Sequence, residues 1–165
     1  MTRLPHTLAA TAALTVLVMT GCQAKLPLLA PKPEPIPTVV RLEMSADTTV
    51  NTDRRGRATP IVVRYYLLQN TAAFDSADFF SLFERDEAVL GAAKVVREEI
   101  TLKPGQAFNA ELKPQGEAKF LAVFAAYRDV NTTGWRATAP VPQNKTTVYT
   151  VRVGQNGIAI GPKSP

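Results

Sequence analysis

Alternating apolar and polar residues dominate the chain from about residue 38 onward. Residues 40–46 show this two-residue period, which is typical of a strand with one buried face. Residues 61–68 are rich in β-branched and aromatic side chains, which favour strands, and residues 119–127 are almost all apolar, as in a central strand. Asn156-Gly157 predicts a tight hairpin near the end of the chain. The segments with the pattern or composition of strands are 40–46, 61–68, 95–102, 108–112, 119–127, 147–153 and 158–160.

One segment has helical spacing instead. Its apolar residues three and four positions apart are Phe79, Leu82 and Phe83. Asp75 or Ser76 is available as the N-cap, so we expect a short helix over about 76–85. Leu90 extends its apolar face by one turn, and Gly91 then ends it. Many short strands with one inserted helix predict an all-β fold, a β-sandwich of about seven or eight strands with a short helical element.

The first 22 residues follow a different pattern. Arg3 precedes the apolar run 8–18, which is too short to span a bilayer, and small residues lead to Cys22. This order predicts a lipoprotein signal peptide over residues 1–21, cleaved before Cys22, the only cysteine of the chain. Cys22 is therefore the predicted lipidation site, because a thiol at this place accepts a diacylglycerol and further acylation (palmitate) completes a stable anchor. Gln23 replaces the Asp of inner-membrane retention signals, which favours the outer membrane.

A proline-rich segment follows the predicted anchor. Its prolines are Pro27, Pro31, Pro33, Pro35 and Pro37. Proline fixes φ and lacks an N–H donor, so residues 22–37 favour an extended tether, about 50 Å long at about 3.1 Å per residue. The alternative is an N-terminal segment with no length requirement. We expect the β-sandwich domain at 38–161 and a C-terminal tail at 162–165.

The composition of the chain excludes most kinds of catalytic site. The formal net charge of +5 permits an acidic partner or a lipid headgroup surface without requiring either, and no nucleic-acid-binding motif accompanies it. His6, the only histidine, lies in the predicted signal, so the mature chain has none for a catalytic triad or a His-based metal site. Glu98 and Glu99 are neighbours in a predicted strand and point to opposite faces, so they cannot form a glycosidase pair. We expect no enzyme activity, no cofactor and no metal.

A polar loop separates the first two predicted strands. It spans Thr48–Pro60 and contains Asn51, Asp53, Arg54, Arg55, Gly56 and Arg57. Loops on rigid sandwiches often carry recognition, and the planar donors of three arginines suit carboxylates. Residue chemistry alone leaves two interpretations evenly balanced, a partner-binding loop and a solvated charged loop.

Several short motifs occur in a fixed order behind the lipobox Thr20-Gly21-Cys22. They are Asn51, Asp53 and Gly56-Arg57; residues 60–68; Phe74, Ala77-Asp78-Phe79 and Leu82; Leu90-Gly91; residues 102–105; residues 121–128; and Trp135-Arg136. Over about residues 39–160, this order resembles the TssJ family, the outer-membrane lipoproteins of the bacterial type VI secretion system. The resemblance implies a transthyretin-like β-sandwich and a role in assembly rather than catalysis.

The resemblance also implies partners. Members of the family recruit the periplasmic C-terminal region of the inner-membrane protein TssM and, with TssL, form an envelope-spanning complex. Their partner-contacting region is the loop between the first two strands, which corresponds to Thr48–Thr59. We therefore expect an outer-membrane-anchored structural lipoprotein whose body faces the periplasm. The alternative is a lipoprotein that binds a small ligand or cell-wall glycan through exposed aromatic residues such as Tyr65, Tyr66 or Trp135. For Trp135, we favour a core position over an exposed one.

Overall fold

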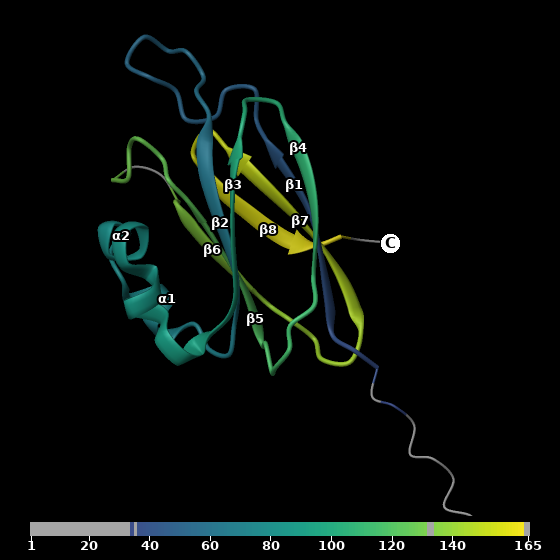
Figure 1. The fold of residues 1–165 in the computed structure, drawn as a ribbon. Coiled ribbons are helices and arrows are strands. Elements are labelled where there is room, and N and C mark those ends of the chain that lie inside the picture. The colour runs from purple at the N-terminus through teal and green to yellow at the C-terminus, as the bar shows by residue number, and fades with distance from the viewer. Residues whose placement is uncertain (1–33, 35, 132–133, 164–165) are drawn as a thin grey trace, which may run out of the picture. The chain divides into compact units, whose positions relative to one another are not determined.

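Eight strands form two four-stranded sheets that pack face to face. The computed structural model describes residues 34, 36–131 and 134–163, so the predicted signal peptide, Cys22 and most of the proline-rich segment lie outside the described residues. One sheet has the order β4-β1-β7-β8, formed by Ala107–Leu112, Val39–Ala46, Thr146–Gly154 and Gly157–Pro162. The other has the order β3-β2-β5-β6, formed by Lys94–Leu102, Ile61–Leu68, Phe120–Ala125 and Arg136–Pro140 (Figure 1). The predicted β-sandwich of seven or eight strands is confirmed.

The main core lies between the two sheets. In β1, the predicted apolar face is buried along its whole length, at Val40, Leu42, Met44 and Ala46. These side chains pack in one cluster with the facing side chains of β2, Ile61, Val63, Tyr65 and Leu67. Neighbouring strands are antiparallel except β1 and β7, which are parallel. The period-two pattern of the sequence therefore fixes which face of each sheet points inward.

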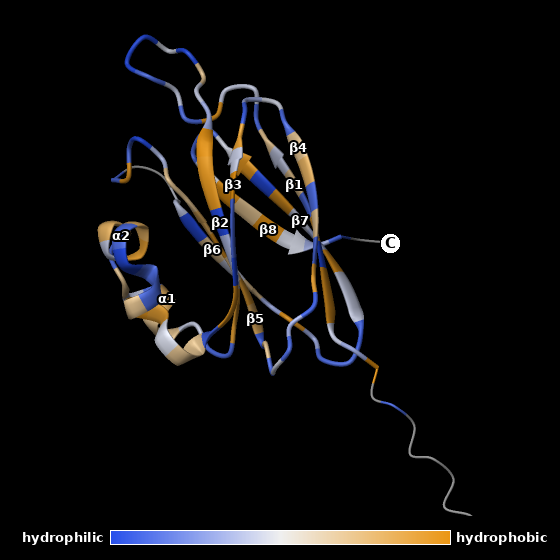
Figure 2. Cartoon of the chain, in the orientation of Figure 1, coloured by the Kyte–Doolittle hydropathy of each residue, from blue (hydrophilic) through white to orange (hydrophobic). Residues whose placement is uncertain are grey.

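A helical layer covers the outer face of the second sheet. It consists of α1 (Ala72–Ser76), α2 (Phe79–Leu90) and a 3₁₀ turn at Gly91–Ala93. A second apolar cluster joins the outward side chains of β2 and β5 to these helices: Tyr66, Leu68, Ala122, Phe124, Phe74, Leu82 and Leu90. Because β2 is buried on both faces, it is hydrophobic along most of its length, as Figure 2 shows. This double burial explains why residues 61–68 are nearly all apolar.

The start of the predicted helix is wrong. We expected one helix over about 76–85, capped by Asp75 or Ser76, but the chain becomes extended at Ala77 and Asp78 and divides the segment into two helices. The N-cap of α2 is Asp78, whose carboxylate accepts a hydrogen bond from the Ser81 N–H at 2.9 Å. A carboxylate at this place satisfies a backbone donor that the first turn leaves without a partner.

The end of α2 follows the sequence pattern. Leu90 is buried and is the last residue of the helix, and Gly91 forms the C-cap at a positive φ of 46°. Positive φ strains residues that carry a Cβ, so glycine suits this position. One strand, β6, is absent from the segments predicted from sequence; it pairs with the outer edge of β5.

Candidate functional site

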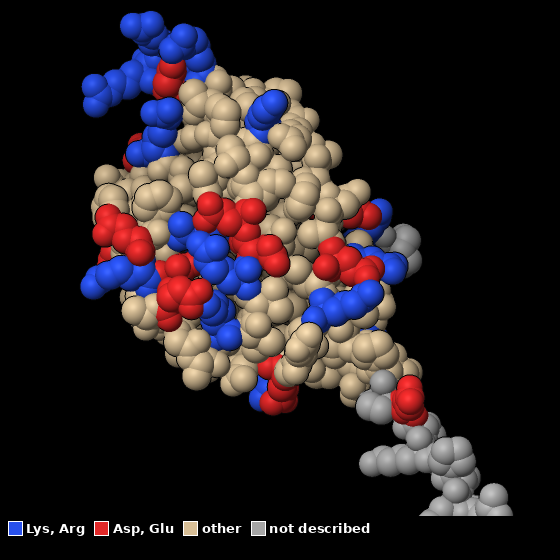
Figure 3. Space-filling model, viewed as in Figure 1, with Lys and Arg blue, Asp and Glu red and all other residues tan. Residues whose placement is uncertain are grey.

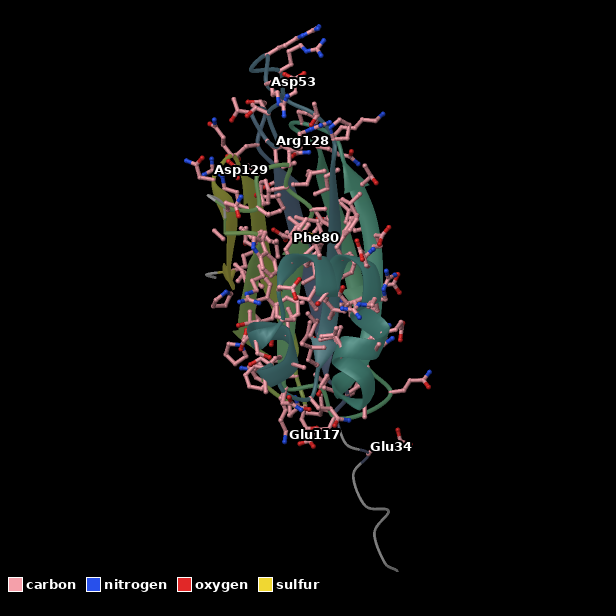
Figure 4. All side chains as sticks on the ribbon, turned by 90° about the vertical axis from the view of Figure 1, so that its left-hand side faces the viewer. Glu34, Asp53, Phe80, Glu117, Arg128 and Asp129 are labelled. Carbon is pink, nitrogen blue, oxygen red and sulfur yellow. The ribbon has the colours of Figure 1, made fainter. Side chains whose placement is uncertain are left out.

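The loop between β1 and β2 stands at one end of the sandwich. Strand β1 begins at Val39 at the opposite end and runs toward this loop (Figure 1). Figure 4 places Asp53 of the loop at one extremity of the domain and Glu34 and Glu117 at the other. The chain therefore enters the domain at one end and presents the predicted partner-binding loop at the other.

The base of this loop is fixed by Asn51. The residue is only 7% exposed and adopts a positive φ of 50°, which asparagine tolerates better than most residues. Its side-chain nitrogen donates to the Pro60 carbonyl at 2.8 Å, and its side-chain oxygen accepts from the backbone N–H of Arg128 at 3.0 Å. The Thr59 hydroxyl donates to the Asn51 carbonyl at 2.6 Å. Asn51 thus closes its own loop and ties it to the segment that follows β5.

The tip of the loop is organised by Asp53. Its carboxylate accepts hydrogen bonds from the backbone N–H groups of Arg55 and Arg57, at 2.8 and 3.0 Å, and from the Arg57 guanidinium at 2.9 Å. The backbone and side-chain hydrogen bonds from Arg57 hold the pKa of Asp53 below its ordinary value of 3.8. Gly56 closes the turn at a φ of 75°. The tip is therefore a folded turn rather than a loose solvated segment.

The three loop arginines differ in their contacts. Arg57 is paired with Asp53 at 2.8 Å, whereas the exposed side chains of Arg54 and Arg55 make no hydrogen bond or ion pair with any described residue. A residue outside the loop adds a further guanidinium: Arg128 is exposed, and its Nε donates to the Thr59 hydroxyl at 3.3 Å. Figure 3 shows basic side chains gathered at this end of the molecule.

A hollow of about 780 Å³ lies between the loop and the segment after β5. Its lining residues are Thr52, Asp53, Arg54, Arg55, Arg128 and Asp129. The structure thus places predicted site residues Asp53, Arg54 and Arg55 around one hollow, whereas Asn51 lies beneath them and Arg57 turns to Asp53. Sequence reasoning missed Arg128 as a member of the site, because 77 residues separate it from Asn51.

The aromatic residues of the glycan-binding alternative are mostly packed inside. Tyr65 and Tyr66 are 4% and 0% exposed. Trp135 is half-buried; its ring lies 5.4 Å from that of Phe79 and 5.6 Å from that of Phe124. Because these side chains contribute to the two cores, the three of them form no exposed aromatic platform for a glycan.

A buried polar network holds the helical layer to the second sheet. The Asp86 carboxylate of α2 is 6% exposed and accepts hydrogen bonds from the Tyr66 hydroxyl and the Arg97 Nε, both at 2.8 Å. Arg64 lies 3.7 Å from Asp86 and donates to Glu99 at 2.6 Å. Burial, and then the hydrogen bond to Asp86, raise the pKa of Tyr66 far above its ordinary value. Arg64 also donates to the Leu82 and Phe83 carbonyls of α2, at 3.0 and 2.7 Å, so the network ties β2 and β3 to the helix.

The described residues contain neither a cluster of metal-ligating side chains nor a membrane-spanning helix. Within residues 34, 36–131 and 134–163, no group of three or more His, Cys, Asp or Glu side chains could hold a metal ion. No helix in the same part of the chain has the length and apolar character needed to cross a bilayer.

Comparison with known proteins places the chain in a family. The family described as "Type VI secretion lipoprotein, VasD, EvfM, TssJ, VC_A0113" matches residues 38–156. The solved structure of the T6SS lipoprotein TssJ1 from Pseudomonas aeruginosa is 30% identical, with a TM-score of 0.75, over 78% of this chain and 98% of that chain. No curated protein matches.

Two further solved structures share the fold. Serratia marcescens Lip, described as a membrane bound component of the Type VI Secretion System, is 26% identical over 79% of this chain and 100% of that chain, with a TM-score of 0.72. A structure described as "T6SS protein TssM C-terminal domain (869-1107) from EAEC" is 26% identical over 74% of this chain and 99% of the matched chain, with a TM-score of 0.59. The chain therefore belongs to the type VI secretion lipoprotein family that includes TssJ.

Proposed function

We propose that this chain is an outer-membrane-anchored structural lipoprotein of the type VI secretion membrane complex, and that its β1–β2 loop docks the periplasmic C-terminal region of TssM. The observation that carries the proposal is the folded, exposed, basic loop at the end of the sandwich opposite the start of β1. Through TssM, the chain is linked indirectly to TssL. It has a binding role and no catalytic one.

The anchor is the second part of the proposal. Residues 1–21 are removed as a signal peptide, Cys22 carries the lipid and the proline-rich segment up to residue 37 spaces the body from the membrane. The body faces the periplasm. Cys22 lies outside the described residues, so the sequence motif supports this part. The start of β1 at Val39 is consistent with it, because this strand begins two residues after Pro37, the last proline of the proline-rich segment.

One comparison supports TssM as the partner. A match over 74% of this 165-residue chain covers 99% of the matched chain, which is therefore much shorter than the range 869–1107 in its description. By its length, the matched chain is better explained as a second protein bound to the TssM domain than as the TssM domain itself. A protein resembling this one would then lie beside the TssM C-terminal domain in that structure.

The docking part is tested by measuring affinity. The lipidated mature chain is extracted in detergent and titrated against the TssM periplasmic region of the same bacterium by biolayer interferometry. Arg54→Glu combined with Arg55→Glu should weaken binding by at least about tenfold, since opposite charges at a close interface are replaced by like charges. Lys119→Glu is the matched control, because Lys119 is 52% exposed and neighbours Glu117 at the opposite end. Absence of wild-type binding would contradict the function, and an unchanged double variant would contradict the role of the loop.

The anchor is tested by Cys22→Ser. A protein without its lipid should leave the outer-membrane fraction and appear in the soluble periplasmic fraction, because no other part of the predicted mature chain carries acyl chains. A variant that still fractionates with the outer membrane would show that lipidation at Cys22 is not the anchor.

A further inference from the structure

The segment that follows β5 forms a second rim of the hollow. Strand β5 ends at Ala125, and Figure 4 shows Arg128 and Asp129, which follow this strand, near the loop end. Tyr127 is 4% exposed and its hydroxyl donates to the Gly154 carbonyl at 2.8 Å, which fixes the segment on β7. Arg128 and Asp129 are exposed beyond this buried ring, and both line the hollow.

The two rims are joined by one part-buried hydrogen bond and one hydrogen bond on the surface. The Asn51 side chain accepts from the Arg128 backbone N–H at 3.0 Å while it donates to Pro60 at 2.8 Å. On the surface, the Arg128 Nε donates to the Thr59 hydroxyl at 3.3 Å. A buried amide that bridges two chain segments holds them in one arrangement, because either segment that moved would leave a buried polar group without a partner. The positions of Arg54, Arg55 and Arg128 are therefore linked before any partner arrives.

The hollow is lined by more uncompensated positive charges than negative ones. Arg54 and Arg55 have no acidic partner among the described residues, and the Nε bond of Arg128 to a neutral hydroxyl leaves its charge uncompensated by that contact. Asp53 is compensated by Arg57, and Asp129, which accepts from the Asn131 backbone N–H at 3.1 Å, adds one negative charge, so the three other guanidinium groups leave the hollow with an excess of positive charge. Guanidinium groups that share a hollow repel one another, so an anionic ligand stabilises the arrangement. Their planar forks match a carboxylate in two-point hydrogen bonds.

From this geometry we infer that the docking site spans both rims, and that Arg54, Arg55 and Arg128 together bind an acidic segment of the partner through its Asp or Glu carboxylates. The inference rests on the proposed function, since the partner is the periplasmic region of TssM. A lipid headgroup is the less suitable source of negative charge, because the predicted anchor precedes Val39, at the end of the domain away from the hollow.

The experiment measures TssM binding by the lipidated mature chain and its Arg128 variants over a series of NaCl concentrations. Loss of a charged hydrogen-bond donor should weaken binding about tenfold or more in Arg128→Gln. Arg128→Lys keeps the charge but loses the fork, so its affinity should lie between those of the wild type and Arg128→Gln. The dependence of log Kd on salt should be shallower in Arg128→Gln than in the wild type or in Lys119→Gln. Melting temperatures should agree, because the exposed Arg128 side chain is replaced and its backbone bond to Asn51 remains.

A charge exchange identifies the class of ligand. Arg128→Glu should lose binding, and reversal of one Asp or Glu of the TssM region to Lys should restore it. Wild-type affinity in every Arg128 variant would overturn the inference and leave the proposed function standing, whereas a wild-type chain that does not bind TssM would contradict the proposed function itself. Failure of every acidic reversal to rescue Arg128→Glu would overturn the acidic segment. Arg128-dependent binding to anionic phospholipid vesicles without TssM binding would assign the hollow to lipid instead.

Discussion

Replacement of Asp86 by alanine tests how the helical layer is held on the sheet. The Asp86 carboxylate is almost fully buried and receives hydrogen bonds from Tyr66 of β2 and Arg97 of β3, both at 2.8 Å. Arg64 lies 3.7 Å away. Alanine would leave the buried Tyr66 hydroxyl and the Arg97 Nε without their acceptor, and would remove the negative charge beside Arg64.

The expected loss of stability depends on which charged groups keep a partner after the Asp86 carboxylate is removed. Removal of one member of a buried ion pair destabilises a protein by about 3–5 kcal/mol, because the remaining charge is uncompensated. Arg64 and Arg97 both keep Glu99 as a partner, at 2.6 and 3.2 Å, so we expect a loss near the lower value, about 3 kcal/mol. In the comparison variant Tyr66→Phe, Asp86 keeps both arginines, so a loss of about 1.5 kcal/mol is expected.

Urea unfolding of the mature chain at pH 7, followed by far-ultraviolet circular dichroism, measures both losses. Burial alone would raise the pKa of Asp86, but the hydrogen bonds from Arg97 and Tyr66 outweigh it and hold this pKa below 3.8. The native carboxylate therefore binds its proton less readily than the unfolded one, and its stabilisation is full above pH 3.8 and is lost as the pH falls through the native pKa. The difference between wild type and Asp86→Ala should shrink below about pH 4. A loss under about 1 kcal/mol at pH 7, or an equal loss at pH 7 and pH 3, would refute the reasoning.

Three other variants test separate features. Gly157→Ala should destabilise the domain by about 1–3 kcal/mol in the same urea assay. Gly157 has a φ of 140°, and a Cβ added there would lie 3.0 Å from backbone atoms of Gly134. Gly161→Ala is the matched control and should change little, because no atom lies within 4 Å of the Cβ that it adds. Asp53→Ala should speed trypsin cleavage after the loop arginines with little change in melting temperature, since the exposed turn loses its acceptor while the core is untouched; an unchanged cleavage rate would show that Asp53 does not order the loop. Phe80→Ser should bind TssM as the wild type does, because Phe80, although 59% exposed, lies on α2 away from the loop end; a tenfold loss would move the docking surface to the helical layer.

Strands with a clear hydrophobic pattern in their own sequence were predicted more accurately than strands without one. Strands β1 and β2 were predicted almost to the residue, because one buried face or two leave a strong apolar signature. Strand β6 was missed because it is short, combines Arg136 and Thr138 with small alanines and ends in Pro140. It is an edge strand at the end of its sheet, and its pairing depends on β5 rather than on its own sequence.

From the sequence, only the part of the site that lies in one continuous segment was predicted. The loop between the first two strands was recognised by its length and its arginines, but its three arginines were treated as equivalent. The structure shows Arg57 paired with Asp53 and a distant Arg128 on the opposite rim of the hollow. Neither arrangement is visible in sequence spacing, because the first depends on the turn at Gly56 and the second on the hydrogen bond from Arg128 to Asn51.

The position of β1 connects the proposed anchor to the proposed docking loop. The proposed tether precedes Val39, the first residue of β1, and the loop follows Ala46, its last residue, so tension between the membrane and a partner bound at the loop would pass through this strand. Strand β1 is hydrogen-bonded along both edges, to β4 from Val40 to Ser45 and to β7 along its whole length. Beyond its end, Asp47 forms a two-point ion pair with Arg152 of β7, at 2.8 and 3.0 Å. A pull along the strand loads these bonds in shear, so many must break together, whereas a pull across an edge strand would open them one at a time. A central strand therefore suits a protein that links a membrane anchor to a partner under load.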